Sequence, residues 1–178
     1  MRDPLPESID PQRYLGTSGG LSGIWPAAGC QRVLSVAERL LSDVSLEFRL
    51  VAGGPYVRLE GRIGVELELC CQRCLRTMSW RLDDQLKLVL VPENAIVAEQ
   101  DGYEPLELND QAHINTGKWI EDEIILRIPS VPVHDRIQDC DPEILNRAHE
   151  FTPGSGGGEK VADNPFTILK DWKENERG

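Results

Sequence analysis

The stretch Val57-Arg-Leu-Glu-Gly-Arg-Ile-Gly-Val-Glu-Leu-Glu-Leu69 carries the clearest structural pattern in the chain. Its apolar residues occupy odd positions and its charged residues occupy even positions, which is typical of a β-strand with one buried face and one wet face. Within this strand, Gly61 and Gly64 predict a bulge or a bend. The stretch therefore predicts a half-buried sheet.

Two neighbouring segments continue this pattern. Val44–Val51 alternates in the same way, and Gly53, Gly54 and Pro55 supply a turn after it. Leu75–Val91 forms a return strand that Pro92 ends. Three antiparallel strands with one solvated face need another element to cover the apolar face.

The segment Trp119–Ile128 is the best candidate for that cover. Ile120, Ile124 and Ile128 recur at helical spacing, and the acidic run 121–123 is expected in the first turns, where the helix dipole favours acids. Pro129 ends the helix. We predict an α+β fold, with a curved antiparallel β-sheet covered by one main helix, an extended N-terminal arm and a short C-terminal helix.

Composition divides the chain into four segments. These are an extended arm rich in Gly, Pro and Ser, a core domain, a flexible Gly-rich linker and a tail helix, at residues 1–30, 31–151, 152–163 and 164–178. Two short helices are also expected in the core, at Gln31–Leu41 and Pro142–His149. A tail helix this short is marginal alone, so its apolar residues Phe166, Leu169 and Trp172 are expected to dock on a partner.

Charge and composition limit the function. The 178 residues carry 19 Lys and Arg against 30 Asp and Glu, a net charge of −11, which is the wrong sign for a protein that coats nucleic acid. No apolar run approaches the roughly 20 residues of a membrane helix. The N-terminus lacks a basic start and an apolar middle, so we expect a cytoplasmic protein with five reduced cysteines and no membrane partner.

The motif Cys71-Gln-Arg-Cys74 lies where two long predicted strands reverse direction. A two-residue hairpin loop favours Gly or Asn, and Gln72-Arg73 offers neither, so another interaction is expected to hold the bend. Two thiolates at this spacing can bind zinc, and His134 with Cys140 would complete a tetrahedral set, with Cys70 as a spare. The alternative is a reduced cysteine pair at a strand end, with His134 an ordinary hydrogen-bonded side chain.

Catalytic interpretations of the same residues are weaker. A thioredoxin-type pair lies at a helix N-terminus, whereas a strand follows Cys74. A metal-dependent phosphohydrolase or nuclease centre at His134-Asp135 and the acidic run 121–123 is a further alternative, but acids in a first helical turn are commonplace and two adjacent residues do not make a catalytic constellation. The sequence contains no nucleophile elbow, phosphate loop or HExxH motif. We expect no enzyme and no small-molecule substrate.

A small basic group surrounds the predicted hairpin tip. It consists of Arg73, Arg76 and Arg81, with the aromatic Trp80 nearby. These residues are candidates for contact with phosphate, an exposed base or a partner protein. A solvated loop with ordinary arginines is the alternative.

The ordered series of motifs resembles the YceD family of large ribosomal RNA accumulation proteins, over roughly residues 35–173. The motifs are Cys-Gln-Arg-Cys at 71–74, Tyr-Glu-Pro at 103–105, Glu-Asp-Glu-Ile-Ile-Leu at 121–126, Pro-Ser-Val-Pro-Val-His-Asp at 129–135 and Asn-Pro-Phe at 164–166. The resemblance implies a non-enzymatic ribosome biogenesis factor for 23S ribosomal RNA. Its partner would be pre-ribosomal 23S rRNA or a basic large-subunit ribosomal protein. The alternative function, which rests on the CxxC hairpin, is that of a small zinc-binding or thiol redox protein.

Overall fold

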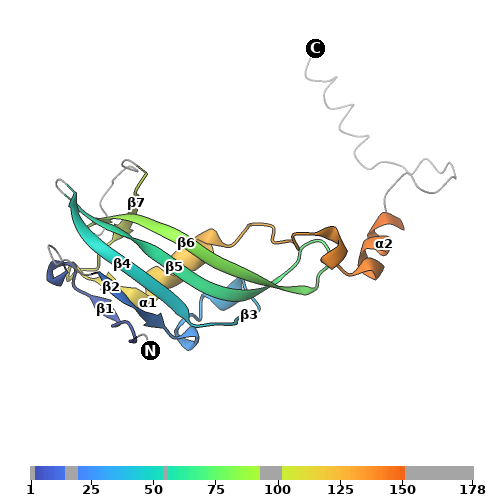
Figure 1. The fold of residues 1–178 in the computed structure, drawn as a ribbon, viewed down its shortest axis with the longest axis horizontal. Coiled ribbons are helices and arrows are strands. Elements are labelled where there is room, and N and C mark those ends of the chain that lie inside the picture. Colours follow the sequence, from blue (N-terminus) through green and yellow to red (C-terminus); the bar gives the residue numbers. More distant parts are fainter. Residues whose placement is uncertain (1–2, 15–19, 54–55, 93–101, 151–178) are drawn as a thin grey trace, which may run out of the picture. The chain divides into compact units, whose positions relative to one another are not determined.

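The predicted alternation produces the two longest strands of the structure, β5 (Tyr56–Cys70) and β6 (Thr77–Val91), which pair antiparallel over nearly their whole length (Figure 1). The structure is a computed structural model that describes residues 3–14, 20–53, 56–92 and 102–150. Its two compact units, Met1–Asp141 and Pro142–Gly178, are considered separately.

One main sheet organises the first unit. Its strand order is β2-β4-β5-β6-β7, and the short β3 pairs with β5 beside β4. All of these pairs are antiparallel except β7, which joins β6 in parallel. The fold is α+β, as predicted. The shorter strands are β1 (Ser8–Ile9), β2 (Leu21–Trp25), β3 (Arg39–Leu40), β4 (Val44–Gly53), β7 (Glu104–Glu107) and β8 (Ile114–Asn115), with β1 and β8 forming a separate pair.

Helix α1 (Thr116–Arg127) covers the apolar face of the sheet. Asn115 caps it by accepting a hydrogen bond from the Lys118 backbone N–H at 3.0 Å, so the helix begins three residues earlier than predicted. Ile120 and Ile124 are fully buried, each contributing about 1.5–3 kcal/mol. Trp119 meets Phe48 edge to face, with ring centroids 5.6 Å apart.

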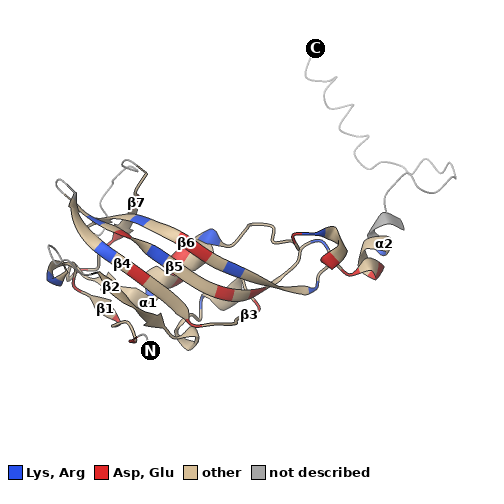
Figure 2. Cartoon of the chain, in the orientation of Figure 1, with Lys and Arg blue, Asp and Glu red and all other residues tan. Residues whose placement is uncertain are grey.

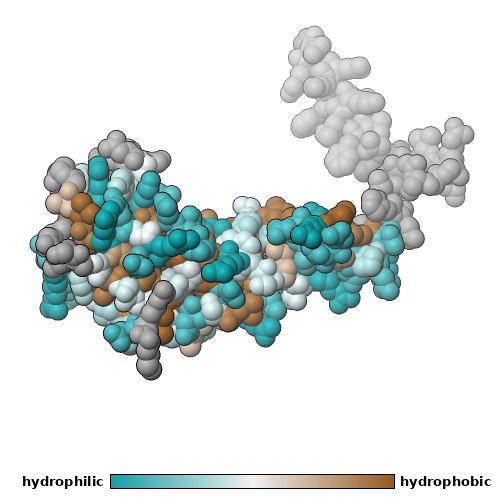
Figure 3. Space-filling model, viewed as in Figure 1, coloured by the Kyte–Doolittle hydropathy of each residue, from teal (hydrophilic) through white to brown (hydrophobic). Residues whose placement is uncertain are grey.

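The other face of the sheet is wet. Charged residues of both signs follow one another along β4, β5 and β6 in Figure 2, and Figure 3 shows hydrophilic residues interspersed with apolar ones on the face in view. Cross-strand ion pairs such as Arg49–Glu60 and Arg62–Asp83 link neighbouring strands. These exposed pairs add little to stability. They account for the charged residues at alternate positions along the strands.

Two predictions about local structure are wrong, a bulge within β5 and a helix over residues 31–41. The pairing register of β5 is unbroken through Gly61 and Gly64, so neither marks a bulge. Gly61 instead permits a close approach of strands, since a Cβ there would lie 2.2 Å from the Glu47 carbonyl oxygen. Residues 31–41 form a 3₁₀ turn and strand β3, because Arg39 and Leu40 pair with β5.

The acidic run in α1 also differs from expectation. Glu121 and Glu123 are buried in the second turn, where Glu121 accepts from the Arg32 backbone N–H and Glu123 accepts from the Trp119 indole at 3.0 Å. These carboxylates therefore pair with nearby donors and do not lie in the first turn.

The expected N-terminal arm contributes to the first unit. Strand β2 pairs with β4, while Leu5 and Ile9 are buried in the core. In the second unit, the expected helix is present as α2 (Pro142–Glu150). The predicted linker at 152–163 and tail helix at 164–178 lie outside the described residues. Short 3₁₀ helices occupy Pro11–Arg13, Ala27–Gly29, Val33–Ser35 and Ile137–Asp139.

Candidate metal centre

The reversal between β5 and β6 is a six-residue loop, not the predicted two-residue loop. The Cys71 backbone N–H donates to the Arg76 carbonyl at 2.9 Å, and the Leu75 N–H donates to the Cys71 carbonyl at 2.8 Å. Left-handed backbone falls on Leu75, with φ 58°, and not on Gln72 or Arg73. This conformation costs a non-glycine residue roughly 1–2 kcal/mol. Such strain persists where surrounding interactions hold the loop.

The segment after α1 returns to this loop. Pro129 ends the helix, and the Gln72 backbone N–H then donates to the Pro132 carbonyl at 2.8 Å. Further along, Asp141 forms an ion pair with Arg76 at 2.7 Å. These contacts bring His134 and Cys140 to the hairpin, although more than 50 residues separate them from it in the sequence.

Four side chains converge at this point, and they are the four metal candidates from the sequence. The ligand atoms of Cys71, Cys74, His134 and Cys140 all lie within 4.8 Å of one another. His134 Nδ1 is 3.6 Å from the Cys74 sulfur and 3.6 Å from the Cys140 sulfur. A tetrahedral zinc with ordinary bond lengths places nitrogen and sulfur about 3.6 Å apart. The donor set and its spacing fit zinc.

Burial and charge favour a cation here. The three sulfurs belong to buried residues, with Cys71 and Cys74 at 0% exposure. Burial opposes ionisation of Cys71, but backbone N–H groups, that of His134 first, outweigh it and lower the thiol pKa to about 6. Burial raises the pKa of Cys140, and the neighbouring thiols raise it further. Adjacent thiolates repel one another, and a bound cation would relieve this repulsion.

The surroundings of the cluster add one donor that the sequence did not indicate. The Arg73 guanidinium donates to the Cys140 sulfur at 3.7 Å, and its charge would offset the net negative charge of three thiolates around zinc. The spare candidate Cys70 is half-buried and lies outside the cluster, paired with Thr77 at the end of the hairpin. Strand β6 follows the motif, so no helix N-terminus activates the thiols.

The predicted basic group is divided by the structure. Arg73 contacts the cluster and Arg76 pairs with Asp141, whereas Arg81 lies on the wet face within 3.9 Å of Asp83. Trp80 has the opposite parity in β6 and packs, half-buried, against the core. The four residues therefore do not form one surface. The predicted docking residues Phe166, Leu169 and Trp172 lie outside the described residues.

Comparison with known proteins bears on the identity of the chain. The model of a family described as "Large ribosomal RNA subunit accumulation protein YceD" matches residues 59–173, which is well over half of the sequence. The chain belongs to the YceD family. The matched region begins within β5 and includes all four candidate ligands.

A curated relative agrees with this assignment. It is the "Large ribosomal RNA subunit accumulation protein YceD" of Haemophilus influenzae (strain ATCC 51907 / DSM 11121 / KW20 / Rd), 28% identical over 176 residues. The alignment covers 96% of this chain and 97% of the relative. No solved structure matches the chain. Among the described residues, no helix has the length and apolar character needed to cross a membrane.

Proposed function

We propose that this chain is a non-enzymatic ribosome biogenesis factor that supports accumulation of 23S ribosomal RNA in the cytoplasm. Membership of the YceD family is the observation that carries the proposal, and the full-length relative is named for large ribosomal RNA subunit accumulation. The chain would associate with pre-ribosomal 23S rRNA or with a basic large-subunit ribosomal protein.

The net charge of −11 favours the protein route. An acidic surface repels the phosphate backbone and steers basic partners towards it over distances of about a Debye length. Direct RNA contact would have to be local. Arg73, Arg76 and Arg81 are each close to an acceptor or an acid within the chain, which reduces the positive charge available to phosphate.

We further propose that Cys71, Cys74, His134 and Cys140 hold a structural zinc. Zinc would supply the positive charge that the adjacent thiolates need, and the chain would supply the hydrogen bonds that orient them. The paired part of β4 ends opposite Gly64, and beyond it the two-residue strand β3 is the strand that pairs with β5 on this side among the described residues. A cross-link to the segment 129–141 would hold the outer part of the β5–β6 hairpin in place.

An association experiment tests the ribosomal role. The tagged chain would be crosslinked in growing cells, purified under denaturing conditions, and its RNA sequenced and its proteins identified. Enrichment of large-subunit rRNA or of large-subunit proteins over small-subunit ones is expected. Equal recovery of both subunits, or of neither, would sink the proposal.

The low pKa of Cys71 supports a second candidate, a thiol redox protein. Such a protein needs an accessible thiolate, whereas Cys71 is fully buried. Timed alkylation of the native protein, read by mass spectrometry, separates the two functions. Rapid labelling of Cys71 or Cys74 would favour redox chemistry, and equally slow labelling of all cysteines would exclude it.

A further inference from the structure

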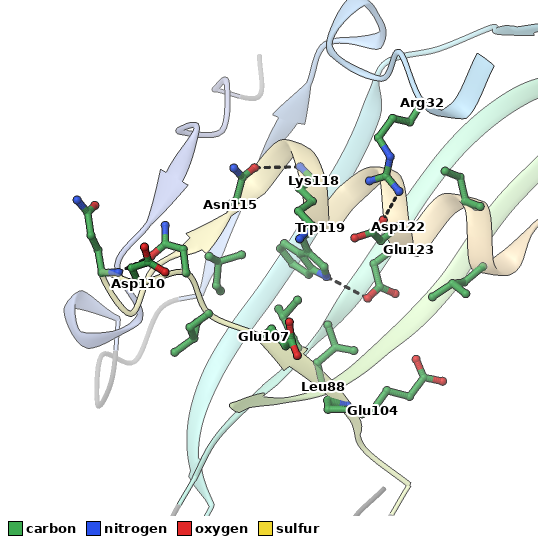
Figure 4. Close-up of a pocket in the computed structure, with 18 residues that line it drawn as sticks. Arg32, Leu88, Glu104, Glu107, Asp110, Asn115, Lys118, Trp119, Asp122 and Glu123 are labelled. Carbon is green, nitrogen blue, oxygen red and sulfur yellow. Dashed lines mark hydrogen bonds and ion pairs between the residues drawn. The ribbon is translucent and has the colours of Figure 1, made fainter. Parts of the chain in front are cut away.

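A groove separates β7 and the loop after it from helix α1 (Figure 4). Its volume is about 910 Å³, at the upper end of the roughly 300–1,000 Å³ range of ligand sites. The floor is mainly apolar. Its half-buried residues are Leu106, Leu108 and Ile125, and it also includes the buried Leu88 and Trp119.

The rim of the groove is acidic. Glu104, Glu107 and Asp110 lie along one side, and none has an ion-pair partner among the residues that the structure describes. On the opposite side, Asp122 pairs with Arg32 at 2.7 Å, so these two charges offset each other. Lys118 is the remaining cation among the lining residues. The open rim charge is therefore negative.

The floor and the rim are preformed. Glu123 is held at the base of the groove by the Trp119 indole and the Arg127 guanidinium. The Asn109 side chain accepts from the backbone N–H groups of Gln111 and His113, at 3.0 and 2.9 Å, which fixes the loop that carries Asp110. A partner would bind without ordering this loop, which preserves affinity.

These features distinguish between classes of partner. Three unpaired carboxylates would repel the phosphates of RNA. The same carboxylates would form ion pairs with Lys and Arg side chains of a partner protein. An apolar floor between acidic residues suits an aliphatic side chain flanked by basic ones. Pro105 has no N–H to offer at the open edge of β7, so recognition by strand addition is disfavoured and side chains dominate.

We propose that this groove binds a basic, extended segment of a partner protein, with an aliphatic anchor on the half-buried Leu106 and Ile125 and with Lys or Arg at the acidic rim. The inference deepens the proposed function by placing the basic partner at a specific surface. Segments of this composition are expected in proteins that themselves contact RNA.

Fluorescence anisotropy with the full-length chain tests the proposal. The probe is a labelled six-residue peptide, Lys-Leu-Lys-Arg-Leu-Lys, compared with the same peptide carrying Ser for Leu and with a labelled RNA of 12 nucleotides. The Leu peptide should bind most tightly, and its affinity should fall with salt. Combined Glu104→Lys and Glu107→Lys should weaken binding by about tenfold or more.

A matched control distinguishes the groove from the general field of the protein. Combined Glu47→Lys and Glu66→Lys changes the net charge equally on the wet face of the sheet. If both double variants weaken the peptide equally, or if the RNA binds more tightly than the peptide, the proposal is wrong. Asp110→Lys, on an exposed loop, serves as a second groove variant if the double variant fails to fold.

Complementation separates failure of the groove from failure of the function. If deletion of the gene leaves large-subunit rRNA unchanged, the proposed function fails. If deletion lowers the rRNA and the groove variant restores it fully, the groove proposal fails while the proposed function stands.

Discussion

Replacing Cys140 by Ser tests the metal centre most sharply, because it removes one of four candidate donors, three of which are buried cysteines. The other two sulfurs, of Cys71 and Cys74, are fully buried and have no solvent to compensate them. Zinc at 100 times its dissociation constant stabilises a native state by about 2.7 kcal/mol. In a unit of this size, each kcal/mol changes the melting temperature by roughly 3–5 °C, so zinc should raise it by about 8–14 °C.

The assay combines metal analysis with thermal melts in the presence and absence of zinc. Wild-type protein is expected to contain about one zinc per chain and to lose that shift when a chelator removes the metal. Cys140→Ser should contain no zinc and show no zinc-dependent shift. Cys70→Ser is the matched control, since Cys70 adjoins Cys71 but lies outside the cluster. Equal zinc loss in both variants, or a zinc-free wild type, would refute the reasoning.

Three further predictions follow from local geometry. Gly61→Ala should lower the free energy of unfolding in urea by about 1–3 kcal/mol, because the new Cβ would lie 2.2 Å from a backbone oxygen. Gly64→Ala should lower it less, because its Cβ would meet the Ser45 hydroxyl at 2.9 Å. Equal losses in the two variants would contradict this reasoning. Leu75→Gly should leave the free energy of unfolding unchanged or raise it by about 1 kcal/mol, since glycine adopts a positive φ without strain. Leu75→Val should lower the free energy of unfolding, and the reverse order of the two variants would be inconsistent with a strained loop. Burial raises the pKa of Glu123 above 4.5, so the native state holds this proton to higher pH than the unfolded state does, and the free energy of unfolding should fall as the pH rises above 4.5. In Glu123→Gln, the free energy of unfolding measured across pH 4.5–7 should lack this fall. The same pH dependence in the variant and the wild type would contradict a raised pKa at Glu123.

The parts of the fold that follow from local patterns were predictable. Alternation in β5 and β6 sets which face is buried, and the spacing of Ile120 and Ile124 sets the face of α1. The same holds for the candidate centre, because Cys71 and Cys74 flank a reversal and the sequence has only three further cysteines and three histidines. The sequence thus predicted four side chains that the structure brings together.

Long-range pairing explains what the sequence did not predict. Val33 and Ala37 are spaced as in a helix, yet Arg39 and Leu40 pair with β5 and extend the chain. Strand β7 contains Pro105 and joins β6 in parallel, which no local pattern indicates. Arg76 is engaged by Asp141, 65 residues later, and this removes it from the predicted basic surface.

The ratio of large-subunit to small-subunit rRNA, in cells that lack this chain and in cells that regain it, is the most direct test of the central claim. The ratio is expected to fall when the gene is deleted and to return when the wild-type chain is restored. An unchanged ratio in deleted cells would contradict the account.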